Sequence, residues 1–369
     1  MNIGIIVTIV GSFGKKGFYN SQEIGLGKAL AKQGHTVLIL KCIDKNFKYE
    51  KEQIAQNLEI EYLPVTHLGA HGYLPGKYIK SNFDAILAFS DTQIFVPHIY
   101  RFCKRNKITF VPYIGIAHSF QQNIKSKFMD ALFKITTLRI YQKIPVIAKT
   151  SAAKDELKNL GVKTCNVAPV GLDTSKLNLN FRESDREALK MKYGFNKDDC
   201  IICFVARLKP EKRPVDLIHI FENIKDEGNR KLLIVGEGPE REQIDMLINK
   251  YNIMDRVKIF EKINYENMWE IHYISDYFVN LRAEEIFGMA VLEAVYYETS
   301  VAAIDAPGPS TILQGMKGHK ICFSDLEIEN WIKSEYPNEK YLRESSEKIL
   351  ENFTWEACAK TFVDMVKGN

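Results

Sequence analysis

Long apolar runs and a secretion signal are both missing from this chain of 369 residues. No stretch approaches the roughly 18 consecutive apolar residues that a membrane-spanning helix needs. Met1 leads directly into a short apolar segment, with no basic region and no small-residue cleavage site. We therefore expect a chain without a membrane span that works in the cytoplasm.

Cysteine is sparse and forms no metal or disulfide pattern. There are seven cysteines, an odd number that is spread over the whole chain, which favours reduced thiols. Cys200 and Cys203 form a single C-x-x-C pair, but no second pair and no histidine spacing accompanies it. The run "DDCIICFVARL" is better explained as a buried strand than as a redox or metal site.

The chain also lacks a large excess of charge of either sign, because the formal net charge is only +4. That excess is too small to predict a nucleic-acid partner by itself. The chain has no Asp-x-Asp pair that would hold a divalent metal, and the adjacent Asp198 and Asp199 are typical of a turn. We expect no metal site.

Short apolar runs alternate with helical patterns through the chain, and this alternation starts again near residues 170–185. At this length, two domains are a better expectation than one core. Alternating strands and helices predict an α/β fold in which helices cover both faces of a parallel sheet. We expect two Rossmann-like domains, 1–175 and 176–352, with ligands at the carboxyl ends of the strands and in the cleft between the domains.

The loop "GSFGKKG" after the first apolar run spaces Gly11, Gly14 and Gly17 as G-x-x-G-x-x-G. It resembles the loop of short-chain dehydrogenases, in which Asp44 would bind an adenosine ribose. The Tyr-x-x-x-Lys pair that such enzymes need occurs four times in this chain, so the pattern carries little information. The loop indicates only that backbone approaches something, often an anion. A dehydrogenase that uses NAD stays open as an alternative.

The stretch "NLRAEEIFGMAVLEAV" carries two glutamates, Glu285 and Glu293, eight residues apart. Gly288 stands where a strand-to-helix loop should end. The backbone N–H groups of Met289 and Ala290 can therefore face a ligand. Taken alone, Glu293 is equally well explained as a solvated acid on a helix.

A second stretch, "VARLKPEKRPVDL", places two cations after a predicted strand. Arg207 and Lys212 lie in the loop, and Pro214 is the expected first residue of the next helix. Fixed cations beside a helix N-terminus suit a diphosphate. Taken alone, they could also be ordinary surface charges.

Taken together, these stretches resemble the retaining nucleotide-sugar glycosyltransferases of the GT-B type, the glycosyl transferases group 1 with an E-x7-E motif. Further matching pieces run through most of the chain: "KALAKQGHTV", "GIAHS", "VAPVGLDTSKL", "IVGEGPEREQI" and "ISDYFVNL". The resemblance implies a GT-B fold, in which two Rossmann-like domains with parallel sheets face each other across an interdomain cleft. It also implies that the C-terminal helix, 353–367, packs back on the first domain.

The resemblance assigns roles to residues. Arg207 and Lys212 would neutralise the departing diphosphate, Glu293 would bind the ribose, and Glu285 would bind hydroxyls of the transferred sugar. His118, in "GIAHS", would contact that sugar from the first domain. The remaining donor-binding positions would be Gly17, Gly236, Phe287, Gly288, Met289, Ala290 and Leu292.

The implied reaction is retaining and needs neither a metal nor another cofactor. The donor would be a nucleoside diphosphate sugar, with UDP as the first choice of nucleotide and GDP as the second. The acceptor would be a glycan or a lipid-linked acceptor in bacterial surface polysaccharide assembly. The chain differs from the family pattern at Leu281-Arg282, at Glu298, and at Thr311 in "PGPST". A degenerate GT-B subunit that binds sugars or a partner without turnover is therefore a second alternative.

The region 99–154 carries eleven Lys and Arg residues and one acid, Asp130. Within it, Ile124, Phe128, Leu132 and Ile135 follow helical spacing. Basic and amphipathic character together predict docking on an anionic membrane surface, at the inner face of the membrane. An ordinary packed helix with a solvated basic face explains the pattern equally well. No recognition motif for nucleic acid accompanies the charge.

Overall fold

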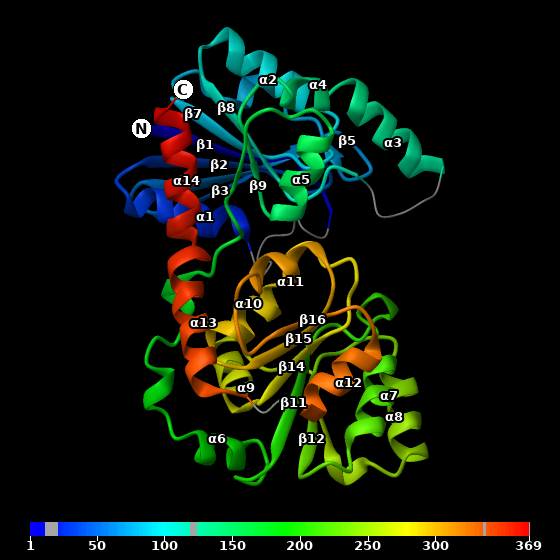
Figure 1. Cartoon of the computed structure of the whole chain (residues 1–369). Coiled ribbons are helices and arrows are strands. Elements are labelled where there is room, and N and C mark those ends of the chain that lie inside the picture. The colour runs from blue at the N-terminus through cyan, green and yellow to red at the C-terminus, as the bar shows by residue number, and fades with distance from the viewer. Residues whose placement is uncertain (12–20, 119–123, 335–336, 369) are drawn as a thin grey trace. The chain divides into compact units, whose positions relative to one another are not determined.

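The structure is a computed structural model that describes residues 1–11, 21–118, 124–334 and 337–368. The chain divides into two compact units, which are described separately. Unit 1 comprises Met1–Asp173 and Phe353–Asn369, and unit 2 comprises Thr174–Asn352 (Figure 1). Within the described ranges, no helix has both the length and the apolar character that crossing a membrane requires.

Unit 1 is built on an eight-stranded sheet in the order β10-β9-β8-β7-β1-β2-β4-β3. All neighbouring strands are parallel except β3, which runs antiparallel on β4 at the edge. The strands are β1 (Asn2–Val7), β2 (Thr36–Asp44), β3 (Glu50–Ala55), β4 (Leu58–Val65), β7 (Ala85–Phe89), β8 (Thr109–Ile114), β9 (Val146–Ala148) and β10 (Cys165–Val167). A separate two-stranded sheet pairs β5 (His67–Leu68) with β6 (His71–Gly72).

Helices cover the sheet of unit 1 because its central strands are apolar on both faces. Strand β1 is buried from Ile3 to Val7, as expected for a parallel strand between two neighbours. The helices are α1 (Gln22–Lys32), α2 (Val96–Arg105), α3 (Ile124–Ile135), α4 (Leu138–Tyr141), α5 (Ser151–Asn159) and α14 (Trp355–Lys367). The predicted α/β class with parallel sheets is confirmed.

Unit 2 contains six parallel strands in the order β13-β12-β11-β14-β15-β16. They are β11 (Cys200–Val205), β12 (Arg230–Val235), β13 (Val257–Phe260), β14 (Tyr277–Asn280), β15 (Ser300–Ile304) and β16 (Lys320–Cys322). Counted within the unit, this is the doubly wound order 3-2-1-4-5-6. Strand order therefore reverses between β11 and β14, and ligands bind outside the carboxyl ends of the strands at such a switch point.

Eight helices of unit 2 lie within the described residues (Figure 1). They are α6 (Arg186–Lys192), α7 (Pro214–Ile224), α8 (Arg241–Lys250), α9 (Met268–Ile274), α10 (Met289–Tyr296), α11 (Pro307–Ile312), α12 (Asp325–Ser334) and α13 (Glu339–Asn352). Helices α7 and α10 follow β11 and β14. Their N-termini therefore begin at the switch point.

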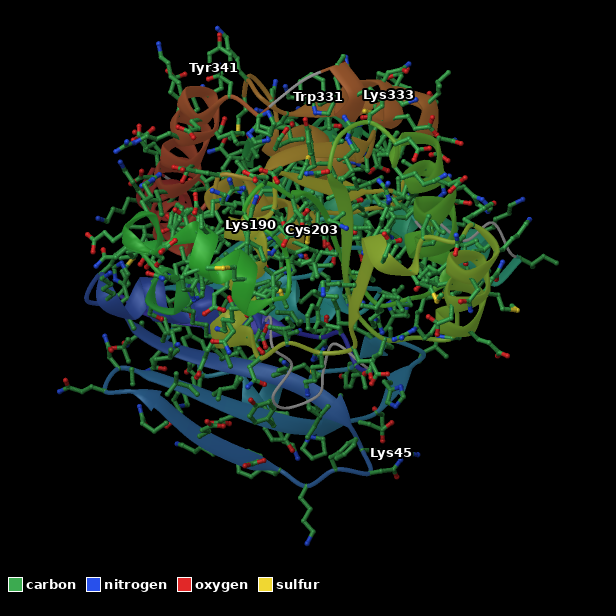
Figure 2. The ribbon with its side chains drawn as sticks, turned by 90° about the horizontal axis from the view of Figure 1, so that it is seen from below. Lys45, Lys190, Cys203, Trp331, Lys333 and Tyr341 are labelled. Atoms are coloured by element: carbon green, nitrogen blue, oxygen red, sulfur yellow. The ribbon has the colours of Figure 1, made fainter. Side chains whose placement is uncertain are left out.

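The C-x-x-C pair lies on β11, where the sequence predicts a buried strand. Cys203 is fully buried, and Figure 2 places it inside the body of unit 2. Burial raises the pKa of the Cys203 thiol to about 12. All seven cysteines are free, so the structural interpretation of the pair is confirmed.

The C-terminal segment joins unit 1 through Trp355, the first residue of α14. The Leu172 N–H donates to the Phe353 carbonyl at 2.8 Å, and the Trp355 N–H donates to the Leu172 carbonyl at 3.3 Å. The Trp355 indole lies directly over Gly25 of α1, so closely that a Cβ at position 25 would overlap the ring. Glycine is therefore required at this helix crossing because of the space that tryptophan occupies.

We expect Gly25→Ala to lower the free energy of unfolding by about 1–3 kcal/mol, because the indole has to move out of a packed contact. Thermal unfolding followed by tryptophan fluorescence measures the change. Gly76→Ala is the matched control, since its added Cβ would meet a Phe102 ring atom at 3.3 Å, and the ring can shift. Equal melting temperatures for Gly25→Ala and the wild type would contradict the packing described for α14.

Candidate functional site

The loop after β11 carries two of the predicted site cations. Arg207 follows the strand by two residues, and Lys212 ends a short 3-10 turn, Pro210–Lys212. Arg213, with a φ of 57°, directly precedes α7 and forms 2.7 Å ion pairs with Asp216 and Asp325. These two carboxylates fix the end of the loop that presents Lys212.

Arg207, unlike Lys212 and Arg213, has no ion pair with any residue that the structure describes. Its side chain is exposed. An unpaired cation at the switch point is suited to an anionic ligand, because its charge is not already neutralised by a carboxylate of the protein.

The loop after β12 packs against the loop after β11, and Gly236 makes this possible. A Cβ on Gly236 would overlap the Ala206 carbonyl oxygen. The Leu208 N–H donates to the Glu237 carbonyl at 2.9 Å, and the Glu240 N–H donates to the Leu208 carbonyl at 3.1 Å. Gly236, a predicted donor-binding residue, therefore brings two loop backbones together next to Arg207.

Glu285 lies between two cations in the loop after β14. Its Oε2 atom is 2.5 Å from Lys212 Nζ and 4.0 Å from an Arg282 nitrogen. The side chains of Glu285 and Lys212 are mostly buried, with 13% and 21% exposed. The structure thus brings together Lys212 and Glu285, which the sequence places 73 residues apart.

The same loop ends at Gly288, the residue that precedes α10. Its φ of 85° lies in the left-handed region, which glycine adopts without strain. The Gly308 N–H donates to the Glu285 carbonyl at 3.0 Å, and a Cβ on Gly308 would overlap the Phe287 backbone. The start of α11 therefore holds the loop, so that the first N–H groups of α10 face the carboxyl edge of the sheet.

The remaining predicted residues of this region lie on α10 or just before it. Phe287 and Leu292 are buried and hold the helix, whereas Met289 and Ala290 are half-buried in its first turn. Glu293 is 8% exposed, and its carboxylate accepts no hydrogen bond from the part of the chain that the structure describes. A buried carboxylate without a donor is unusual and is suited to a ligand that supplies hydroxyl groups.

Arg282 belongs to this site, although the sequence-based set of site residues does not include it. It stands at one of the positions where the sequence differs from the pattern that it otherwise resembles. Its Nε atom is buried without a hydrogen-bond partner among the described residues. With Arg207 and Lys212 it adds a third cation to the loops at the switch point, close to the carboxylate of Glu285. In the sequence, the only indication that Arg282 belongs to the site is its position three residues before Glu285.

The predicted sugar contact His118 lies in unit 1, in the loop that follows β8. Its Nδ1 atom is 2.6 Å from Glu156 Oε1, and the Ala117 N–H donates to the other oxygen of Glu156 at 3.3 Å. The Gly115 N–H donates to Asp91 Oδ1 at 2.5 Å. Glu156 and Asp91, which were not predicted, therefore fix the His118 loop. Gly17 lies outside the described residues.

A metal-ligand set was not expected from the sequence. Within residues 1–11, 21–118, 124–334 and 337–368, no group of three or more His, Cys, Asp or Glu side chains could hold a metal ion.

Comparison with known proteins identifies one family in unit 2. Residues 185–334 match the model of the family described as glycosyl transferases group 1. The chain is 23% identical to the N-acetyl-alpha-D-glucosaminyl L-malate synthase of Bacillus anthracis, over 80% of this chain and 77% of that protein. It is also 23% identical to the probable sucrose-phosphate synthase of Thermosipho melanesiensis, over 93% and 88% of the two chains.

Solved structures show the same fold over the whole chain. A sucrose-phosphate synthase from Thermosynechococcus elongatus aligns with a TM-score of 0.73 and 16% identity, covering 100% of this chain and 99% of that one. The Anabaena protein Alr3699/HepE, solved in complex with UDP, aligns with a TM-score of 0.75 and 15% identity over 100% of both chains. The predicted GT-B fold is confirmed.

The contact between Lys212 and Glu285 can be measured as a coupling free energy. We expect Glu285→Gln and Lys212→Met each to destabilise the chain, and the double variant to lose about 1–3 kcal/mol less than the sum of the two. Urea unfolding of the four proteins measures it. Lys209→Met, in the same loop but without an ion pair among the described residues, is the control. Strict additivity would contradict the contact.

Proposed function

We propose that this chain, a group 1 glycosyltransferase of the GT-B type, is a retaining enzyme whose donor substrate is a nucleoside diphosphate sugar. It transfers a hexose residue to a glycan or lipid-linked acceptor in the assembly of a bacterial surface polysaccharide. The observation that carries this proposal is the contact of Lys212 with Glu285 at the switch point, directly before α10. This contact supports the proposal because a cation suited to phosphate lies beside a carboxylate suited to sugar hydroxyls.

The diphosphate of the donor is bound by positive groups of unit 2. Arg207 is unpaired within the described chain, and Lys212 is held in place by the two ion pairs of Arg213. The first N–H groups of α10 add the positive end of a helix dipole. Supporting UDP as the nucleotide, Alr3699/HepE was solved with UDP and with UDP-glucose.

The two glutamates of the motif hold the other parts of the donor. Glu293, buried and without a hydrogen-bond donor from the described chain, accepts from the ribose hydroxyls. Glu285 accepts from hydroxyls of the transferred sugar and shares its charge with Lys212 and Arg282. In unit 1, the Glu156 carboxylate orients the ring of His118.

The transfer step needs positioning and charge stabilisation more than covalent chemistry of the protein. The bond between the anomeric carbon and the diphosphate oxygen breaks, and the acceptor oxygen bonds to that carbon on the same face. The acceptor proton passes to the departing diphosphate. Arg207 and Lys212 stabilise the negative charge that develops there. We propose that this step requires no metal ion and no other cofactor.

The dehydrogenase alternative required Asp44 to bind an adenosine ribose. The structure engages this carboxylate otherwise, because Asp44 accepts from the Asn46 N–H at 2.9 Å and lies 3.0 Å from His67 Nε2. The Asn46 and His67 hydrogen bonds lower the pKa of Asp44 and hold it as a loop anchor. This observation favours the glycosyltransferase proposal over NAD binding.

Nucleotide binding tests the donor site. In calorimetric titrations with UDP, GDP and NAD without added metal, we expect one nucleoside diphosphate to bind and NAD not to bind. Glu293→Ala should weaken that binding by about tenfold, since a charged hydrogen-bond acceptor is lost. Glu344→Ala, an exposed glutamate on α13, is the control. Binding of NAD alone would overturn the proposal.

The acceptor side is proposed to dock on an anionic membrane surface through α3. Three apolar residues of α3 point to solvent, with exposed fractions of 89% for Ile124, 65% for Phe128 and 58% for Ile135. Exposed cations accompany them: Lys127, Lys134, Arg139 and Lys143. Phe133, on the other side of the helix, is fully buried and anchors it. An exposed apolar row beside cations is suited to the interface of an anionic bilayer.

Vesicle sedimentation tests this docking. We expect the chain to bind vesicles that contain phosphatidylglycerol more tightly than pure phosphatidylcholine, and to lose binding as salt screens the charges. Replacing Phe128 and Ile135 together by serine should reduce binding about tenfold or more. Met246→Ser, an exposed apolar residue of unit 2, is the control. Equal binding by the double variant and the wild type would contradict the proposal.

A further inference from the structure

Helix α9 brings a histidine beneath the predicted ribose-binding carboxylate. Helices α9 and α10 are neighbours in unit 2 (Figure 1). His272, on the last turn of α9, is completely buried. Its ring lies parallel to the Tyr297 ring, with 8° between the planes, and its centroid is 5.7 Å from that of Phe278. The imidazole is thus held in one orientation by aromatic neighbours.

The polar atoms of this imidazole have no partners in the structure. Both Nδ1 and Nε2 are buried, and neither forms a hydrogen bond with any described residue. Nε2 is 3.7 Å from Glu293 Oε2, which is longer than a hydrogen bond. Two buried imidazole nitrogens therefore have no hydrogen-bond partner among the described residues, and Nε2 faces a carboxylate just beyond bonding distance. Unpaired buried polar atoms cost free energy and are rare in proteins.

A small movement would satisfy both groups. Glu293 lies on α10 at the switch point, and a shortening from 3.7 Å to about 2.9 Å creates a hydrogen bond. The Thr299 hydroxyl donates to the His272 carbonyl at 2.6 Å and anchors the backbone of the histidine. Since the histidine is fixed by its neighbours, the carboxylate is the group that moves.

We propose that His272 is a positioning residue for Glu293 when nucleotide binds. The Nε2–H of the neutral imidazole donates to Oε2, and the other carboxylate oxygen is directed toward the ribose hydroxyls. This inference rests on the proposed function, because it takes Glu293 as the ribose-binding group. His272 itself touches no substrate. It fixes the rotamer of a carboxylate that would otherwise lack a buried donor.

A purely structural histidine would behave differently. If His272 only filled the core between Phe278 and Tyr297, His272→Leu would preserve the packing. Any loss of nucleotide affinity would then be the same whether or not the ligand carries ribose hydroxyls. If it positions Glu293, its removal weakens only ligands that carry the ribose hydroxyls. Binding of nucleotides with and without these hydroxyls separates the two roles.

The experiment is a calorimetric titration of the full chain with UDP and with 2′,3′-dideoxy-UDP. We expect His272→Leu to weaken UDP binding about tenfold and to leave 2′,3′-dideoxy-UDP unchanged within twofold. His272→Gln, whose Nε2–H can take the place of the imidazole Nε2–H, should restore UDP binding to within about threefold of wild type. In a Glu293→Ala background, His272→Leu should have no further effect.

The remaining outcomes are also decisive. Equal weakening of both ligands by His272→Leu, or additivity with Glu293→Ala, overturns the positioning role while the proposed function stands. Ile274→Val, a buried substitution on the same helix, controls for general loosening of α9. If the leucine variant fails to fold in a thermal melt, the glutamine variant carries the comparison. Failure of the wild type to bind UDP or GDP overturns the proposed function, and this inference with it.

Discussion

The candidate site depends on the contact between Lys212 and Glu285. It joins the loop after β11 to the loop after β14, the two strands between which the order of the unit 2 sheet reverses. Parallel strands bring their carboxyl ends to one edge, but only a contact between side chains fixes the loops beyond that edge. Arg213 on one side and Gly308 on the other hold these loops in place.

Much of this arrangement was predictable from the sequence. The strands on both sides of Arg207 and Glu285 are short, apolar runs, and such runs alternating with helices lead to a doubly wound sheet. Gly288 marks the start of α10 because a left-handed residue is needed there. The C-x-x-C pair was correctly assigned to a buried strand, since Cys203 has no polar neighbours in the sequence that would make a site.

The remaining contacts are decided by tertiary packing, and the sequence contains no local signal for them. Glu156 contacts His118, which lies 38 residues earlier in the chain, and no local pattern around Glu156 indicates this contact. His272 lies on an apolar helix face, where a histidine is normally structural. The sequence also did not predict that Phe128 is exposed, because apolar residues at helical spacing can face either the core or the solvent.

The arrangement of these loops implies that a nucleotide binds to unit 2 at the switch point. Hydrogen–deuterium exchange of the full chain with and without UDP tests it most directly, because it reports where the backbone is protected. Peptides that contain residues 207–213 and 282–293 should be protected, with exchange slowed about tenfold when the UDP concentration is about ten times its Kd. Unchanged exchange of both loops, with UDP bound by calorimetry, would contradict it.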